Sequence, residues 1–339
     1  MARSSPMIAP LPYTDCPLDR ATHLRADPGW VEARRRDRGS VFVAVCRDRN
    51  LITGEPPRAL LLRGDSEGVS PLVASEAAFA FLGVSRSGPF DGAAWFAVEA
   101  DAQLARPLTQ ATGGAFTELR RVSGQLPAGE AAVLAYARAL MHWHRRHRFC
   151  GVCGRATAVR DGGHSRLCLD PGCGTQHFPR TDPAMIVLVT RNGPQGEACL
   201  LARQAGWPQG LVSTLAGFVE PGETAEAAVV REVREEVGID VGCVRYAGSQ
   251  PWPFPSSLML AFRAVAPPGA ELTLDPRELE SGRWFSRDEV VRLGELGLKL
   301  PTADSIARRL IEDWLAEADS EPDRMLSGME LGSRMEVGR

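Results

Sequence analysis

Three glutamates expected on one helix turn are the residues in this sequence best suited to hold a catalytic metal. Residues 224–237 are predicted to be helical, and Glu232, Glu235 and Glu236 stand at positions i, i+3 and i+4 within them. Residues at these spacings share one helix face, so the three carboxylates repel one another unless cations lie between them. Their hard oxygen ligands suit Mg²⁺ or Mn²⁺, ions that neutralise a diphosphate and lower the pKa of a bound water. The alternative is an acidic, solvated helix face supported by neighbouring arginines.

Four cysteines form two closely spaced pairs that are typical of a zinc ribbon. The pairs are Cys150 with Cys153 and Cys168 with Cys173, and fourteen residues lie between the two pairs. Four thiolates on two knuckles complete a tetrahedral shell, which predicts one structural zinc per chain without a catalytic role. The alternatives are a redox CxxC motif or free buried thiols. His164 and His177 are near enough to be rival ligands, but four cysteines already fill the shell, so both are expected at the surface.

Composition limits the other classes of function. Net charge is −3, which argues against a surface that coats nucleic acid broadly. Lys299 is the only lysine, so phosphate binding has to use guanidinium groups, metals or backbone amides. No apolar run approaches the roughly 18 residues of a membrane span, and the first residues lack the apolar core of a signal peptide. We therefore expect a cytoplasmic protein with no membrane contact.

The length of 339 residues predicts two domains and a small module. Short apolar runs between turns predict strands from about 40 to 122, and a further strand is expected at 184–189. Residues 129–147 and 306–318 are predicted helices, and no internal repeat is apparent. The expected segments are a partly irregular N-terminus (1–38), a β-rich domain with a closing helix (39–147), a zinc ribbon (148–178), a catalytic domain (179–318) and a polar disordered tail (319–339).

The stretch GFVEPGETAEAAVVREVREEVGI, which begins at Gly217, resembles an unbroken Nudix box. The resemblance implies an α+β protein in which a Nudix α/β/α sandwich is preceded by the zinc ribbon and the β-rich domain. It also implies that Arg231 pairs with Glu223 and fixes the loop against the helix. The catalytic set implied is Glu223, Arg231, Glu232, Glu235 and Glu236. The implied Mg²⁺ or Mn²⁺ ligands are the Ala216 carbonyl, Glu232, Glu236 and Glu278, with Glu280 as a rival for Glu278.

The stretch SQPWPFPSS at 249–257, together with the ribbon, resembles the NADH pyrophosphatase branch of that family, over about 119–315. Its prolines keep the backbone rigid, and Trp252 and Phe254 offer flat faces for a base or a nicotinamide ring. The alternative is a proline-rich turn with core aromatics. The residues expected to contact substrate are Phe178, Phe218, Gln250, Pro251, Trp252, Pro253, Phe254, Pro255, Ser256, Ser257 and Ala307. Phe178 stands where the family commonly carries tyrosine, so stacking is retained without a hydroxyl contact.

The resemblance implies hydrolysis of NADH or NAD⁺ to reduced nicotinamide mononucleotide (NMNH) or NMN plus AMP. Removal of NAD caps from RNA 5′ ends and a homodimeric assembly are also implied. Arg120 is a candidate phosphate contact or a surface salt bridge, and residues 145–148 are a candidate RNA contact or a solvated helix end. Alternative functions are hydrolysis of ADP-ribose or diadenosine polyphosphates, or a non-catalytic nucleotide sensor. The intact set of three glutamates argues against a sensor.

Overall fold

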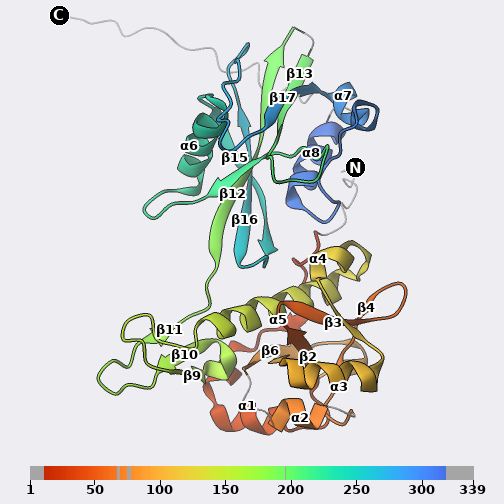
Figure 1. Ribbon diagram of the computed structural model, residues 1–339, viewed down its shortest axis with the longest axis vertical. Coiled ribbons are helices and arrows are strands. Elements are labelled where there is room, and N and C mark those ends of the chain that lie inside the picture. Colours follow the sequence, from red (N-terminus) through yellow and green to blue (C-terminus); the bar gives the residue numbers. More distant parts are fainter. Residues whose placement is uncertain (1–10, 67–68, 75–77, 195, 318–339) are drawn as a thin grey trace, which may run out of the picture.

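The computed structural model describes residues 11–66, 69–74, 78–194 and 196–317. Two units, each built around one sheet, are stacked along the long axis of the molecule, and the zinc ribbon projects beside the lower unit (Figure 1). The predicted tail at 319–339 lies outside the described residues. Among the helices that are described, none is long and apolar enough to cross a membrane.

The C-terminal sheet is the framework that carries the glutamates. Its strand order is β15-β16-β12-β13-β17, with β14 paired to β12; β12 and β16 run parallel and the other pairs are antiparallel. The strands are β12 (Asp182–Gly193), β13 (Gly196–Arg203), β14 (Leu215–Phe218), β15 (Gly242–Trp252), β16 (Ser257–Val265) and β17 (Ser281–Ser286).

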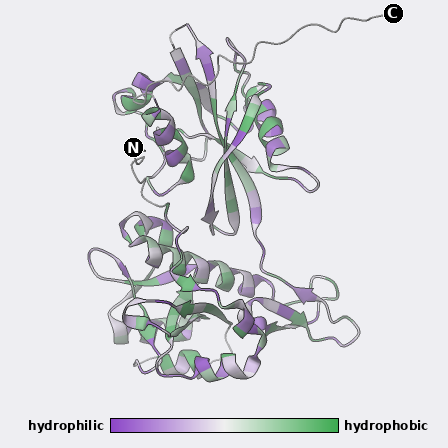
Figure 2. Ribbon diagram, turned by 180° about the vertical axis from the view of Figure 1, so that it is seen from behind, coloured by the Kyte–Doolittle hydropathy of each residue, from purple (hydrophilic) through white to green (hydrophobic). Residues whose placement is uncertain are grey.

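Both faces of this sheet are covered by helices, as predicted. Side chains on β12 alternate: Met185 and Val187 pack under α6 (Ala225–Val237), whereas Ile186 and Leu188 pack under α8 (Ile306–Ala316). Because strand side chains point to opposite faces in turn, one buried apolar run supplies two cores. The short helices α7 (Arg287–Val291) and η5 (Leu293–Leu296) complete the α8 face. Figure 2 shows apolar residues in the strands between the helix layers.

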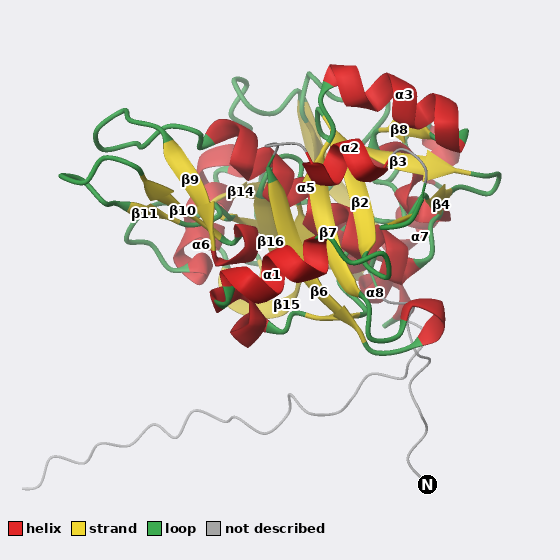
Figure 3. Cartoon of the chain, turned by 90° about the horizontal axis from the view of Figure 1, so that it is seen from below, coloured by secondary structure: helices red, strands yellow, loops and turns green. Residues whose placement is uncertain are grey.

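The N-terminal unit is more helical than the sequence predicts. Helix α5 (Ala128–Arg146) covers one face of its sheet, and α1 (Pro28–Arg35), α2 (Val69–Ala74) and α3 (Ala102–Thr112) pack on the other (Figure 3). The strands are β1 (Leu18–Asp19), β2 (Val41–Cys46), β3 (Arg49–Thr53), β4 (Arg58–Ala59), β5 (Leu62–Arg63), β6 (Phe79–Ser85), β7 (Ala94–Glu99) and β8 (Ala115–Thr117). The shorter helices are η1 (Thr22–Ala26), η2 (Gly88–Phe90), α4 (Leu119–Val122) and η3 (Ser123–Gln125).

The two sheets share one topology, although no repeat is apparent in the sequence. The order β6-β7-β2-β3 matches β15-β16-β12-β13, and the central pair is parallel in both, β2 with β7 and β12 with β16. Strand β5 pairs with β2 as β14 pairs with β12, so α2 occupies the chain position of α6. Helix α2 reads VSPLVA and carries no acidic residue. The three glutamates predicted to hold a metal therefore belong to the C-terminal sheet alone.

The zinc ribbon is attached to α5 by a buried histidine. Its strands are β9 (Thr157–Arg160), β10 (Ser165–Cys168) and β11 (Gln176–His177), with η4 (Asp161–Gly163) between the first two. His144 Nε2–H donates to the Gly163 carbonyl at 2.9 Å, and its Nδ1 accepts from Arg166 at 2.9 Å. Burial lowers the pKa of His144 to about 3, so the ring is neutral and locked in this tautomer.

Candidate functional site

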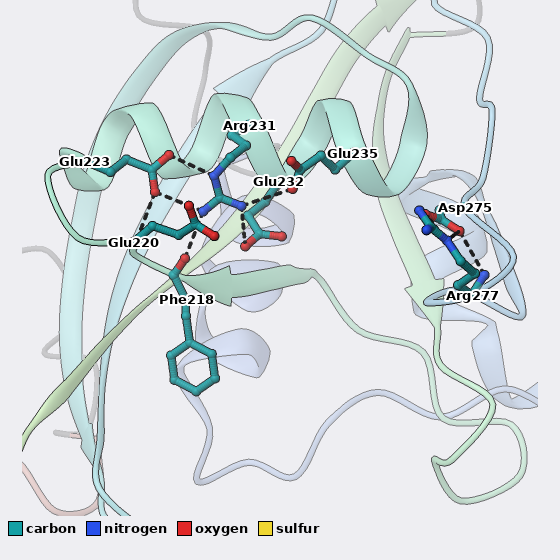
Figure 4. Close-up of polar contacts among 8 residues, drawn as sticks. All are labelled: Phe218, Glu220, Glu223, Arg231, Glu232, Glu235, Asp275 and Arg277. Atoms are coloured by element: carbon teal, nitrogen blue, oxygen red, sulfur yellow. Dashed lines mark hydrogen bonds and ion pairs between the residues drawn. The ribbon is translucent and has the colours of Figure 1, made fainter.

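Arg231 is the centre of the polar network beside the Nudix-like helix (Figure 4). Its guanidinium grips Glu223 with two bonds, at 2.8 and 2.9 Å, and donates to the Phe218 carbonyl at 2.9 Å. The loop between β14 and α6 is thereby fastened to the middle of the helix. The same guanidinium also reaches Glu232 at 2.9 Å and Glu235 at 3.0 Å. The carboxylates raise the pKa of Arg231 above its ordinary value, chiefly through the hydrogen bonds that Arg231 donates to Glu223.

Three carboxylates converge next to this network. Glu232, Glu236 and Glu278 each offer an oxygen within 4.8 Å of the other two. Glu236 is only 2% exposed, and its Oε2 has no hydrogen-bond partner among the residues that the structure describes. Burial, together with the charges of Glu232 and Glu278, raises its pKa to about 8. A buried carboxylate with an oxygen that accepts no hydrogen bond among the described residues lowers stability when two other carboxylates lie beside it. A bound cation removes this cost, so these residues fit a divalent metal.

The backbone of β14 runs close to the same cluster. A Cβ added at Gly217 would lie 2.0 Å from Glu232 Oε1, so only glycine allows this approach of strand to carboxylate. Ala216 precedes it in β14, in register with Ile186, which brings the proposed carbonyl ligand to the same region.

The structure favours Glu278 over Glu280 as the third carboxylate. Glu280 is paired with Arg203 at 2.6 Å, whereas Glu278 belongs to the cluster. The loop that carries Glu278 is bound to the end of α6, because the amide of Asp275 donates to the Glu236 carbonyl at 2.9 Å. The amide of Glu278 then closes a turn onto Asp275 at 3.1 Å. No sequence spacing encodes this loop-to-helix contact.

The four predicted cysteines form one cluster. Their sulfurs all lie within 4.8 Å of one another, with Cys150 and Cys173 at 3.8 Å and Cys153 and Cys168 at 3.4 Å. These separations are far longer than a disulfide, about 2.05 Å. They match the edge of a zinc tetrahedron, about 3.8 Å for a Zn–S bond of about 2.3 Å. The cluster therefore fits a closed structural zinc site.

Neither rival histidine joins the cysteine shell as a fifth member. His164 is half-buried rather than at the surface, since its Nε2 lies 2.7 Å from the Phe81 carbonyl and burial lowers its pKa to about 4. His177 lies outside the four sulfurs with its Nε2 3.3 Å from Cys150 Sγ. Its position allows an N–H···S bond that supports the thiolate rather than replacing it.

Two of the expected aromatic contacts are open to solvent. Phe178 is 64% exposed and Phe218 is 61% exposed, so neither is a core residue. Phe178 directly follows the ribbon strand β11, and Phe218 ends β14 beside the carboxylate cluster. Flat apolar faces left in water at these two positions are suited to stacking on a ring of a substrate.

The side chain of Gln250, an expected substrate contact, is used in packing between segments. Its side chain is fully buried, and the amide donates to the carbonyls of Pro12 and Asp304 and accepts from the Ile306 amide. These bonds tie β15 to the start of α8 and to the N-terminal segment. Ala307 is also buried, in the core under α8, so only its backbone remains available to a ligand.

The rest of the SQPWPFPSS stretch forms a hairpin tip against the N-terminal unit. Trp252 and Phe254 lie edge-to-face at 5.2 Å and pack on Tyr13 and its core cluster, so the core interpretation is partly correct. Arg120 stacks on both rings, at 5.2 and 5.7 Å, and makes no ion pair within the described ranges.

A pocket of about 280 Å³ opens on the Trp252 side of the hairpin. Its lining includes Pro251, Trp252, Pro253, Ser256 and Ser257, together with Arg20, Tyr136 and Arg180. Ser256 donates to Asp182 at 2.7 Å. Sequence reasoning missed Arg20 and Tyr136, because residues so far apart in the chain meet only through the packing of the N-terminal segment on α5.

The fold and the site together define an α/β/α metal-dependent hydrolase joined to a zinc ribbon. Family models describe the same parts: a NUDIX domain at 180–313, an NADH pyrophosphatase-like rudimentary NUDIX domain at 39–143 and an NADH pyrophosphatase zinc ribbon domain at 145–178. The chain belongs to the Nudix family, in the branch that carries these NADH pyrophosphatase-type domains.

Two relatives illustrate the branch. The protein named NAD-capped RNA hydrolase NudC of Stutzerimonas stutzeri is 43% identical, over 71% of this chain and 80% of its own. The human protein named NAD-capped RNA hydrolase NUDT12 is 34% identical, over 88% of this chain and 72% of its own. Among solved structures, a NUDIX hydrolase from Nitrosomonas europaea aligns with 51% of this chain and 92% of its own, at 24% identity and a TM-score of 0.36.

Proposed function

We propose that this chain hydrolyses the diphosphate bond of NADH or NAD⁺, giving NMNH or NMN and AMP, and that it removes NAD caps from RNA. The observation that carries the proposal is the buried carboxylate of Glu236, which lies within 4.8 Å of Glu232 and Glu278 oxygens and whose Oε2 has no hydrogen-bond partner in the described ranges. The names of the two relatives, both NAD-capped RNA hydrolases, support the choice of substrate class.

Mg²⁺ or Mn²⁺ is the proposed metal, held by Glu232, Glu236, Glu278 and the Ala216 carbonyl. When bound, such an ion neutralises the diphosphate and lowers the pKa of a water molecule. The chain supplies orientation: Arg231 holds Glu232 and Glu235 at 2.9 and 3.0 Å, and so fixes two acids on consecutive helix turns. The exposed rings of Phe178 and Phe218 offer stacking faces for the nicotinamide or the adenine.

A homodimer is proposed for the assembly. The ribbon exposes three large apolar side chains, Phe149, Val152 and Leu169, at 63%, 74% and 56%. Side chains of this size on a small module are more stable when covered. Light scattering coupled to size-exclusion chromatography measures the oligomeric state. A monomer at micromolar concentration contradicts the proposed homodimer.

A side-by-side comparison of kcat/KM tests the substrate. NADH, NAD⁺, NAD-capped RNA, ADP-ribose and a diadenosine polyphosphate are assayed with Mg²⁺ and with Mn²⁺. We expect NADH, NAD⁺ or capped RNA to exceed ADP-ribose by at least tenfold. Preference for ADP-ribose or the polyphosphate overturns the proposed substrate, and the absence of hydrolysis of every compound points to a sensor instead.

A further inference from the structure

A second pocket, of about 360 Å³, lies on the Phe254 side of the hairpin, between the hairpin and the N-terminal unit. Its charged lining consists of Arg47, Arg49, Arg120, Arg138, Asp48 and Glu118, and we call it the arginine pocket. It contains none of the three clustered glutamates and shares none of its lining with the pocket beside Trp252. Its charge therefore needs a separate explanation.

The two acids of the arginine pocket are engaged by cations other than its arginines. Asp48 pairs with Arg145 and accepts from His142 Nδ1–H at 3.0 Å. Glu118 pairs with Arg121 at 3.2 Å. In contrast, the side chains of Arg47, Arg49 and Arg120 form no ion pair and no hydrogen bond in the part of the chain that the structure describes. The pocket is left with an excess of positive charge.

Arg138 adds a buried cation to the wall. It is 9% exposed, its Nε donates to the Asp48 carbonyl at 3.0 Å, and its guanidinium lies 4.7 Å from the centre of the Phe254 ring. Its Nη1 is buried and has no hydrogen-bond partner among the described residues. A buried guanidinium with an unused donor is costly to keep charged, and a nearby anion offsets that cost.

The turn that presents Arg47 and Arg49 is held in one shape. Arg47 and Asp48 have φ of 47° and 67°, so β2 and β3 are joined by a two-residue turn with two left-handed residues and no glycine. Such a turn is unfavourable for these residue types. The bonds from Arg138 and His142 to Asp48 keep it closed, and Arg47 and Arg49 project from it to solvent. Little ordering is required when an anion binds.

We propose that the arginine pocket binds a phosphate group other than the diphosphate that is cleaved, and that this phosphate belongs to the RNA chain of a capped substrate. The inference rests on the proposed function. Planar guanidinium forks match phosphate oxygens in geometry and charge. The hairpin tip contributes to both this pocket and the one beside Trp252, so the two pockets are near enough for a dinucleotide and the RNA chain attached to it.

Kinetics on two substrates test the pocket. The double variant Arg47→Gln/Arg49→Gln removes two exposed charges, and Arg34→Gln/Arg36→Gln removes the same number at the C-terminal end of α1, on the face of the N-terminal sheet opposite the hairpin. We expect the first variant to raise KM for a short NAD-capped RNA about tenfold, to leave NADH kinetics unchanged and to lower the slope of log KM against log salt by about 1.4 for two contacts to a single strand. A first variant that behaves like the α1 control on capped RNA overturns the proposal.

Binding of uncapped RNA separates this proposal from the proposed function. Fluorescence anisotropy with a labelled, uncapped 5′-monophosphate oligonucleotide requires no hydrolysis. Weaker RNA binding by the Arg47→Gln/Arg49→Gln variant supports the arginine pocket even if no NAD compound is hydrolysed. Unchanged RNA binding overturns the proposal even if NADH is a good substrate. Inorganic phosphate and AMP are titrated as competitors. If they bind the wild type tightly, and only their binding is lost in the variant, the pocket is a site for a free anion and the RNA assignment is wrong.

Discussion

Arg231 and Glu223 are joined by two parallel hydrogen bonds, 2.8 Å from Nε and 2.9 Å from Nη2. Glu223 in turn accepts from the Glu220 amide at 3.1 Å, so one carboxylate connects the helix to the turn that precedes it. The remaining guanidinium nitrogen lies within 3.0 Å of Glu232 and Glu235 oxygens. A single planar side chain thus sets both the loop and the orientation of two acids at the site.

Replacing Arg231 by lysine should therefore impair catalysis through geometry. Lysine keeps the charge but cannot reach Glu223, Glu232 and Glu235 together in one plane. We expect kcat to fall roughly 100-fold, a size typical of a misplaced catalytic group, with the circular dichroism spectrum unchanged. Arg234→Lys on the same helix, where the arginine pairs with exposed Asp240, is the control. Equal activity of both variants would show that the fork is dispensable.

The zinc site should matter for stability and not for the chemical step. Purified, reduced protein should carry about one zinc per chain, and Cys153→Ser should release it and lower the melting temperature. Cys243→Ser removes an exposed cysteine outside the cluster and should change neither property. Zinc content is measured by mass spectrometry of the metal. Active protein that contains no zinc would contradict the assignment of a zinc site to the four cysteines.

Removing an exposed ring should weaken substrate stacking without affecting stability, whereas removing a ring at the hairpin tip should affect both. Phe178→Ala should weaken NADH binding by about 1–3 kcal/mol, by analogy with base–aromatic stacking, which appears as a higher KM. The melting temperature should be unchanged. Tyr246→Ala, a similarly exposed aromatic on β15, is the control. Trp252→Ala should lower stability as well as binding, because its ring packs on Tyr13 and the N-terminal core. If Phe178→Ala keeps the KM of the wild type, that ring does not contact the substrate.

The pKa of Glu236 predicts how the metal-free protein responds to pH. Its pKa is raised from 4.5 to about 8 by burial and by neighbouring carboxylates, so between these values the folded state holds a proton that the unfolded state has lost. Stability of the metal-free protein should therefore fall as pH rises from about 4.5 to 8. Urea unfolding in EDTA at pH 5, 6.5 and 8 measures the trend, and Glu236→Gln should flatten it. Added Mg²⁺ should stabilise most at the upper end, since it binds the deprotonated carboxylate. A slope that is the same in wild type and variant would assign the titration to other groups.

The sequence was sufficient where function depends on spacing within one element. Glu232 and Glu236 meet in one cluster as their i, i+4 spacing predicts, and the four cysteines also form the predicted cluster. Glu235 lies outside the carboxylate cluster and pairs with Arg231 instead. Glu278 could not be distinguished from Glu280, because the choice is made by a loop that is hydrogen-bonded to the end of α6.

Sequence patterns do not show where a side chain serves packing between distant segments. Gln250 has a polar side chain of the kind that contacts ligands, but its amide group is hydrogen-bonded to the backbone of Pro12, Asp304 and Ile306. The fold of the N-terminal unit was predicted only as strands with a closing helix. Two of its outer helices, α1 with eight residues and α2 with six, are too short to give a clear period, and their apolar residues pack only after the sheet has formed.

The test of the metal site is the substitution Glu236→Gln. Glutamine keeps the size of the side chain and its tendency to form helix, but it removes one negative charge from the cluster of Glu232, Glu236 and Glu278. It also gives the buried position a neutral group, so the fold should be at least as stable as that of the metal-free wild type. The expected loss is several kcal/mol of transition-state stabilisation, expressed in kcat, with dinucleotide binding only modestly weakened.

A matched pair of variants sharpens the same test. Glu278→Gln should lose activity in the same way as Glu236→Gln, and raised Mg²⁺ should partly restore it, because the lesion is a weakened ligand. Glu280→Gln, whose carboxylate pairs with Arg203, should remain active. In ¹⁸O-water the wild type should place the label on a phosphate of one mononucleotide product, as attack of water at phosphorus requires. Near-full activity of Glu236→Gln, or activity of the wild type in excess EDTA, would show that these carboxylates do not serve a metal, and the hydrolytic mechanism assigned to this helix would have to be abandoned.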